Sequence, residues 1–191
     1  MDLVSNVKIY GLEDSVKASK YPMAIDTSKC TDEITNRVKS LGSVPTGTAH
    51  DQFTTGIIVQ FDLTFSLKAW TEAERYHFFD FVSSQSTMHR VSKFNLGVQC
   101  NEYVDDAILN IVESKRLAYI NDPTPEKYLE LLYNIPTGFR LTARMTTNYR
   151  QLKTIYYQRK DHRLPEWREF CAWIETLPHF KEICLGGESN E

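Results

Sequence analysis

The chain has 191 residues, of which 41% are hydrophobic and 12% aromatic. These proportions predict a globular protein with a sizeable core and exclude disorder over most of the chain. A formal net charge of −3 argues against a general nucleic-acid-binding protein and leaves room only for a local basic groove.

The sequence carries no signal for export and no apolar run near the roughly 20 residues that span a bilayer. Its four cysteines are far apart, without a CxxC pair or the spacing of a zinc site. We therefore expect reduced thiols, no metal and a cytoplasmic location. Without repeats or a shift in composition, the sequence predicts one domain over residues 1–191, with a polar tail at about 186–191.

In the first half of the chain, the clearest element is a strand at residues 56–66. Apolar and polar side chains alternate there with a period of two, so one face of the strand is strongly apolar. Residues 68–83 then read as a helix whose second half, 76–82, is apolar almost all round and expected to be buried. Weaker signals predict a strand at 7–10, helices at 12–20 and 32–40, a loop at 43–54, and a helix end or loop at 85–95.

The second half is expected to be mainly helical around one further alternating strand at 139–147. Helices are predicted at 103–119, 125–133, 149–160 and 165–175, and Pro125 and Pro165 suit the first turns of two of them. Mixed helices and strands predict an α+β fold, with a mixed or antiparallel sheet flanked by long helices. The expected core consists of Ile57, Val59, Phe61, Leu63, Phe65, Phe78, Phe79, Val82, Leu141, Met145, Leu152 and Ile155.

Cationic charge is concentrated between residues 136 and 163. This stretch holds seven arginine and lysine residues and one acid, Asp161, so it carries +6 in a chain of −3 and leaves −9 for the remainder. Arginine forks match phosphate and carboxylate oxygens through paired hydrogen bonds. An anionic ligand is therefore the first hypothesis, and ordinary ion pairs are the alternative.

Arg150 and Arg159 are the main candidates for holding such a ligand. On an ideal helix nine residues amount to a net rotation of about 180°, so these two side chains leave opposite sides. They would serve two subsites, two subunits of an oligomer, or separate ion pairs. His89 with Arg90, and His50 in a loop rich in Gly and Thr, are further candidates, although solvated side chains are the simpler interpretation of each.

The order and spacing of these pieces resemble the flavin-dependent thymidylate synthases. The segment Asn148-Tyr-Arg150-Gln-Leu152, followed by Arg159, is similar to the family's Asn-x-Arg-Ser-Leu and the arginine that ends the next helix. No nucleophile elbow, phosphate-binding loop or dinucleotide fingerprint competes with this interpretation.

Two upstream segments add to the resemblance, which covers roughly residues 15–167. Gln85-Ser-Thr-Met-His89-Arg90 is similar to the family's Gln-x-x-Arg-His-Arg. His50 falls where a loop histidine precedes the family's Phe-Glu-His strand. The motifs are individually short, and their common order carries the resemblance.

The resemblance implies an activity and a set of ligands. In that family dUMP becomes dTMP; methylenetetrahydrofolate gives the carbon, reduced flavin gives the hydride, and NADPH usually reduces the flavin. The implied cofactor is FAD, the implied partner is a pyrimidine nucleotide, and the family's sites lie between subunits of a homotetramer. By position, the implied site residues are catalytic Gln85, His89 and Arg90, cofactor-binding His50, His89, Arg90, Asn148 and Arg150, and substrate-binding Gln85, Arg90 and Arg159.

Two departures from the family pattern keep other functions open. Met88 stands where the family has an arginine, and Gly97-Val98-Gln99 occupies the place of a family serine. A second hypothesis is therefore a non-catalytic protein that sequesters or senses a nucleotide in the same basic pocket. A third is a single-strand nucleic-acid binder that uses charge and stacking; its groups would be Arg140, Arg144, Tyr149, Tyr156 and Tyr157, and helix packing is the simpler interpretation of the tyrosines.

Overall fold

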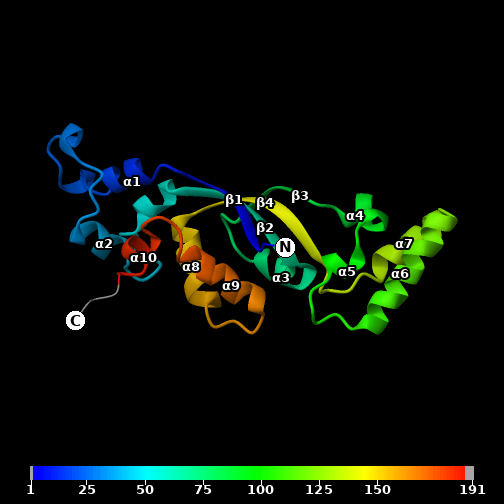
Figure 1. Cartoon of the computed structure of the whole chain (residues 1–191). Helices are drawn as coiled ribbons and strands as arrows, with labels where there is room; N and C mark the ends of the chain where they lie inside the picture. The colour runs from blue at the N-terminus through cyan, green and yellow to red at the C-terminus, as the bar shows by residue number, and fades with distance from the viewer. Residues whose placement is uncertain (1, 188–191) are drawn as a thin grey trace.

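The computed structural model describes residues 2–187 and is built around a four-stranded antiparallel sheet in the order β1-β2-β4-β3. Figure 1 shows α8 and α9 along one side of the sheet, with α6 and α7 at one end of the molecule and α1, α2 and α10 at the other. The predicted α+β fold with an antiparallel sheet and flanking helices is confirmed. The strands are β1 Val4–Tyr10, β2 Ile58–Ser66, β3 Asp80–Ser84 and β4 Arg140–Asn148.

Most of the helices begin at a polar residue whose side chain accepts a hydrogen bond from the first turn, as Thr124 does from the amide of Lys127. The helices are α1 Leu12–Ala18, α2 Asn36–Gly42, α3 Leu67–Ala73, α4 Thr87–Arg90, α5 Leu96–Gln99, α6 Asp106–Asn121, α7 Pro125–Tyr133, α8 Tyr149–Arg159, α9 Pro165–Ile174 and α10 Phe180–Cys184. Short 3-10 turns are η1 Tyr21–Met23, η2 Thr27–Lys29, η3 Gln52–Gly56 and η4 Val91–Lys93.

The two central strands, β2 and β4, have one apolar and one polar face, as their alternation predicts. They pair from Ile58 with Asn148 to Ser66 with Arg140. On the polar face Asp62 accepts a hydrogen bond from Arg144 at 3.2 Å, and the hydroxyls of Thr64 and Thr142 lie 2.8 Å apart. These cross-strand pairs fix the register from the polar side while the opposite face packs into the core.

The main core lies between the apolar face of the sheet and the helices α8 and α9. Its centre is aromatic: Phe61 and Phe65 of β2 are fully buried, as are Trp167 and Phe170 of α9. The ring centroids of Phe65 and Trp167 are 4.8 Å apart, in an edge-to-face arrangement. A second, smaller core joins α6 and α7 to the start of β4, with Phe139, Val112 and Leu131 buried in it.

The helix expected at residues 68–83 is wrong in its second half. Helix α3 ends at Ala73, and Asp80 opens β3, an edge strand that pairs only with β4 among the described strands. Phe79 is buried, but Phe78 is 67% exposed and Val82 58% exposed, contrary to the prediction that both are buried. Phe78 also has a left-handed φ of 59°, which reverses the chain into the strand. An apolar run around a turn and an edge strand thus imitates a buried helix.

Smaller differences concern element ends and short helices. The helix expected at 32–40 begins only at Asn36, and the one expected at 103–119 begins at Asp106 behind the capping side chain of Asp105. Helices α5 and α10 were not predicted, because four or five residues are too few for a periodic pattern. Leu141 is partly rather than fully buried. Most of the expected polar tail at 186–191 lies outside the described residues.

Within residues 2–187, no helix combines the length and the apolar character needed to cross a bilayer. The same part of the chain has no group of three or more His, Cys, Asp or Glu side chains placed to hold a metal ion.

The cysteines differ in their surroundings, which gives a simple chemical prediction. Cys30 is partly exposed, whereas Cys100, Cys171 and Cys184 are buried. Burial raises the pKa of both the Cys171 and the Cys184 thiols to about 12, so neither forms thiolate at neutral pH. We expect Cys30 alone to react quickly with Ellman's reagent in the folded protein, and all four thiols after denaturation. Rapid native reaction of a second thiol would contradict this packing.

Candidate functional site

The start of α8 forms a pocket that contains two of the predicted site residues. Asn148 ends β4 and caps α8, because its Oδ1 accepts a hydrogen bond from the amide of Gln151 at 2.9 Å. The turn places Asn148 and Arg150 side by side in the wall of a pocket of about 520 Å³. Gln52 of η3 and the exposed ring of Phe78 complete its rim.

Arg150 is held by a buried carboxylate that the sequence did not single out. Asp51 is fully buried, and its Oδ1 accepts from Nε of Arg150 at 3.0 Å while its Oδ2 accepts from Nζ of Lys153 at 3.0 Å. Lys153, also fully buried, donates in addition to the carbonyl oxygens of Gly42, at 2.7 Å, and Val44. Two cations share one carboxylate, so this cluster carries a net charge of +1.

This cluster leaves part of the Arg150 guanidinium available to a ligand. Nη1 donates to Oε1 of Gln52 at 2.8 Å, while Nη2 has no hydrogen-bond partner among the described residues. A fixed guanidinium with a free donor edge suits an oxyanion such as a phosphate, because Asp51 and Lys153 offset each other and leave the charge of Arg150 uncancelled.

Arg159 lies in a different environment, where its charge is already paired. Its Nη1 donates to Glu72 at 3.0 Å, its Nε donates to the hydroxyl of Tyr76 at 2.6 Å, and its guanidinium carbon lies 4.9 Å from the ring centroid of Trp167. His162 also contacts Glu72, with Nε2 3.2 Å from Oε2. Arg159 is therefore an anchor between α3, α8 and α9.

The groups around Arg159 have shifted pKa values for distinct reasons. Burial acts to raise the pKa of Glu72, but the hydrogen bond from Lys68 and the charges of His162, Lys68 and Arg159 outweigh it, so the pKa is lowered. Burial lowers the pKa of His162 despite the attraction of Glu72. Glu72 is therefore ionised near neutral pH and offsets the charge of Arg159.

The pockets of Arg150 and Arg159 are neighbours on α8. A second pocket of about 300 Å³ is lined by Arg159 and Tyr76, and it shares Gln151 and Thr154 with the pocket of Arg150. The two arginines leave opposite sides of the helix, as their spacing predicts, and flank one polar stripe. One chain therefore presents two adjacent pockets, each lined by one of the two arginines.

The structure does not bring Gln85, His89 and Arg90 to this pocket. Gln85 follows β3 and is bonded to Thr142 of β4, whose amide donates to its Oε1 at 2.9 Å. Thr142 and Asn148 are six residues apart on β4, which is about 20 Å along a strand. His89 and Arg90 lie beyond Gln85 on α4 (Figure 1), and both are exposed.

His50 lies in an exposed turn and is not part of the pocket lining. Its neighbour Asp51 is the residue that contacts Arg150. A signal for this contact was present in the sequence, because Arg150 and Lys153 are three residues apart and therefore share one side of a helix. Two neighbouring cations on one side of a helix predict a nearby acidic side chain that offsets their charge, but the sequence does not identify that residue.

Most of the five residues proposed for binding single-stranded nucleic acid have partners within the fold. Tyr149 is fully buried and donates its hydroxyl to the carbonyl of Pro178, and Tyr156 donates to Glu175. Arg144 is paired with Asp62. The simpler interpretation of these tyrosines, helix packing, is confirmed for Tyr149.

The fold that holds these pockets is that of the flavin-dependent thymidylate synthases. The crystal structure of the enzyme ThyX from Helicobacter pylori, complexed with FAD and dUMP, matches 94% of this chain and 98% of that chain, with a TM-score of 0.71 and 16% identity. Another ThyX structure from Helicobacter pylori with FAD and dUMP matches 93% of this chain and 96% of its own, with a TM-score of 0.70 and 15% identity. Comparison with protein-family models gives no match, and neither does comparison with curated proteins.

Proposed function

We propose that this chain binds FAD and a pyrimidine nucleotide, and that it methylates dUMP to dTMP in the manner of the flavin-dependent thymidylate synthases. The observation that supports this most directly is the pocket at the start of α8. There Asn148 and Arg150, the residues matched to the family's flavin contacts, lie together at the end of β4. The likeness in fold to enzymes solved with FAD and dUMP supports the same proposal.

The residues of this pocket suit part of an anionic, aromatic cofactor such as FAD. A volume of about 520 Å³ lies within the roughly 300–1,000 Å³ usual for small-molecule sites. Arg150 offers its free Nη2 to a phosphate or carbonyl oxygen, and Asp51 with Lys153 keeps the guanidinium in place. Phe78 exposes a flat aromatic face at the rim, where a left-handed φ in a bulky residue marks a position held against local strain.

We further propose that the site is completed by another copy of the chain. Gln85, His89 and Arg90 lie about 20 Å or more along the sheet from Asn148, too far to touch the same ring in one chain. A homotetramer of the family's kind would place these residues of one copy against the α8 pocket of another. Bound FAD would supply the hydride, with methylenetetrahydrofolate as carbon donor and NADPH as reductant, while Gln85, Arg90 and Arg159 would position the nucleotide.

Replacing Arg150 with glutamine tests the cofactor pocket. Loss of a hydrogen bond to a charged group removes about 1.5–3 kcal/mol, so we expect FAD affinity to fall roughly tenfold to a hundredfold. Quenching of flavin fluorescence during titration with protein measures the dissociation constant. Arg163→Gln is the matched control, since Arg163 is exposed in the same basic segment, outside the pocket. Absence of FAD binding by the unaltered protein would refute the proposal.

A second function, nucleotide binding without catalysis, is favoured by two exposed apolar side chains. Met88 is 57% exposed and Val98 55% exposed, at the positions where the family has an arginine and a serine. Gln99 cannot replace that serine, because its side chain donates to the carbonyl of Arg140 and is buried. Calorimetric titration with dUMP, with and without FAD, separates the two functions. Binding that is independent of flavin, without turnover, supports the second, and dTMP formation excludes it.

A further inference from the structure

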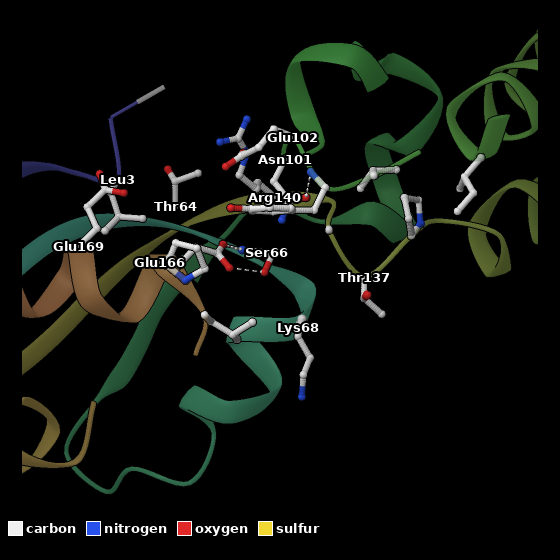
Figure 2. A pocket seen from close by; sticks show the side chains of 17 residues that line it. Leu3, Thr64, Ser66, Lys68, Asn101, Glu102, Thr137, Arg140, Glu166 and Glu169 are labelled. Carbon is white, nitrogen blue, oxygen red and sulfur yellow. Dashed lines mark hydrogen bonds between the residues drawn. The ribbon is translucent and has the colours of Figure 1, made fainter. Parts of the chain in front are cut away.

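A separate pocket of about 410 Å³ lies at the other end of the two central strands (Figure 2). It forms where Thr64 and Ser66 of β2, the start of β4, the 101–104 loop and the beginning of α9 meet. None of its lining residues belongs to the pockets of Arg150 and Arg159. The proposed flavin site therefore does not account for it.

The walls of this pocket are fixed by hydrogen bonds between segments far apart in sequence. The carboxylate of Glu166 accepts from the amide of Ser66 at 2.6 Å and from its hydroxyl at 2.8 Å, as Figure 2 shows. The amide of Asn101 donates to the carbonyl of Gly138 at 3.0 Å. A Cβ on Gly138 would lie 2.5 Å from Cγ2 of Val104, so the glycine allows the loop to close on the strand. The cavity is thus held open by a fixed frame.

One side of the pocket has an arginine whose hydrogen-bond donors are only partly used. Nη2 of Arg140 donates to the carbonyl oxygens of Val98 and Cys100, at 3.2 and 3.1 Å. Its Nε is buried and has no hydrogen-bond partner among residues 2–187. That atom is not open to the pocket, but Nη1 of the same guanidinium is not buried and also has no partner there, so an acceptor from outside the chain can reach it.

The remaining unpaired charge in the lining is negative. Glu166 is engaged by Ser66 and Lys68 is paired with Glu72, but Glu102 and Glu169 have neither an ion pair nor a hydrogen bond within the described part of the chain. Glu169 projects from α9, on another wall than Arg140 (Figure 2). The pocket therefore combines one donor for an oxyanion with two carboxylates for a cation.

We propose that this pocket binds a small zwitterionic organic molecule, with a carboxylate, an amine and an apolar body between them. The carboxylate accepts from Nη1 of Arg140, and the ammonium is attracted by the free carboxylates of Glu169 and Glu102. Leu3, Val104 and Ile108 contact the apolar part. The proposal is independent of flavin or nucleotide binding, because it uses none of the residues of that site.

The probe for this site is 4-(aminomethyl)benzoate, which carries both charged groups on a flat apolar ring. Titration followed by protein NMR or calorimetry should give a dissociation constant. Two matched compounds, 4-methylbenzoate without the amine and benzylamine without the carboxylate, should each bind roughly tenfold more weakly, as expected for the loss of one charged hydrogen bond. Equal binding of either compound would overturn the zwitterion assignment, as would no binding of the probe at millimolar concentration.

A pair of double variants tests the site on the protein side. Glu102→Gln/Glu169→Gln removes both free carboxylates, which have no structural partner, and should weaken the probe roughly tenfold without changing the melting temperature. Glu74→Gln/Glu126→Gln makes the same charge change at exposed glutamates outside the pocket and should leave binding unchanged. Arg140→Lys should weaken 4-methylbenzoate, which uses only that end, more than benzylamine. Equal effects of the two double variants would overturn the proposal.

Discussion

Replacing Asp51 with asparagine is expected to lower the free energy of unfolding by about 3–5 kcal/mol, because it leaves the buried ammonium of Lys153 without its counter-charge. Asp51 and Lys153 are both fully buried, and their charged atoms are 3.0 Å apart. The carbonyls of Gly42 and Val44 still accept from Lys153, but they carry no charge to offset it. Urea denaturation followed by circular dichroism measures the loss.

Two further variants distinguish a buried charge from a general effect of removing an acid. Asp62→Asn breaks the ion pair with Arg144. Both side chains of this pair are partly exposed, at 24% and 25%, so the free energy of unfolding should fall by no more than about 1 kcal/mol. Asp51→Asn combined with Lys153→Met removes the stranded charge and should recover part of the stability. If Asp51→Asn costs no more than Asp62→Asn, Lys153 does not depend on this carboxylate.

Asp51 also connects stability to the proposed function. The carboxylate that neutralises Lys153 is the one that orients Arg150 toward the α8 pocket. A protein that only needed a stable core at this position could place an apolar residue there at less cost. The ion cluster is consistent with a need for a guanidinium in a fixed orientation, whose positive charge is left uncancelled because Lys153 offsets Asp51.

The elements that the sequence predicts best are those in which local pattern and tertiary environment agree. The alternation of apolar and polar residues in β2 and β4 predicts strands with one buried face, and each of these strands does have one buried face. Helix α7 spans Pro125–Tyr133 as expected, because Pro125 occupies its first turn and Thr124 caps it. Both signals lie within a few residues of the element that they define, so no distant contact is needed to interpret them.

The sequence is least informative where a contact crosses a long stretch of chain. The cationic segment suggested an anionic ligand, yet four of its seven cations, Arg144, Arg150, Lys153 and Arg159, are paired with Asp51, Asp62 or Glu72. Lys153 and Asp51 are 102 residues apart. Charge summed over a segment cannot reveal such partners, because they approach only when β2, α3 and η3 pack against β4 and α8.

In the candidate site, too, the neighbours in sequence could be predicted and the long-range contacts could not. Asn148 and Arg150 are neighbours in sequence, and the cap of α8 keeps them together. Gln85, His89 and Arg90 were grouped with them only by resemblance, and the sheet separates the two sets. The sequence does not predict that the ring of Phe78 lies exposed at the rim, because a phenylalanine within the apolar run 76–82 is more often buried.

Replacing Phe61 with alanine is expected to lower the free energy of unfolding by about 3–5 kcal/mol, because the change leaves a cavity at the centre of the aromatic core. Phe61 is fully buried, and its ring centroid lies 4.8 Å from that of Trp173, 5.7 Å from that of Phe170 and 6.2 Å from that of Phe79. These neighbours come from α9 and the turn before β3, so the surroundings cannot collapse around the gap without moving both of these segments. Chemical denaturation at constant m-value gives the change in stability.

Phe78→Ala is the matched control, since it removes the same side chain from a position that is 67% exposed. It should change stability by only about 0.5 kcal/mol, as expected for a surface position. The pair of variants also tests the conformation of residues 76–82 directly. If that run were a buried helix, as its composition suggests, Phe78→Ala would cost about as much as Phe61→Ala. A large difference between them supports the turn and edge strand seen in the structure, which leave the Phe78 ring free at the rim of the α8 pocket.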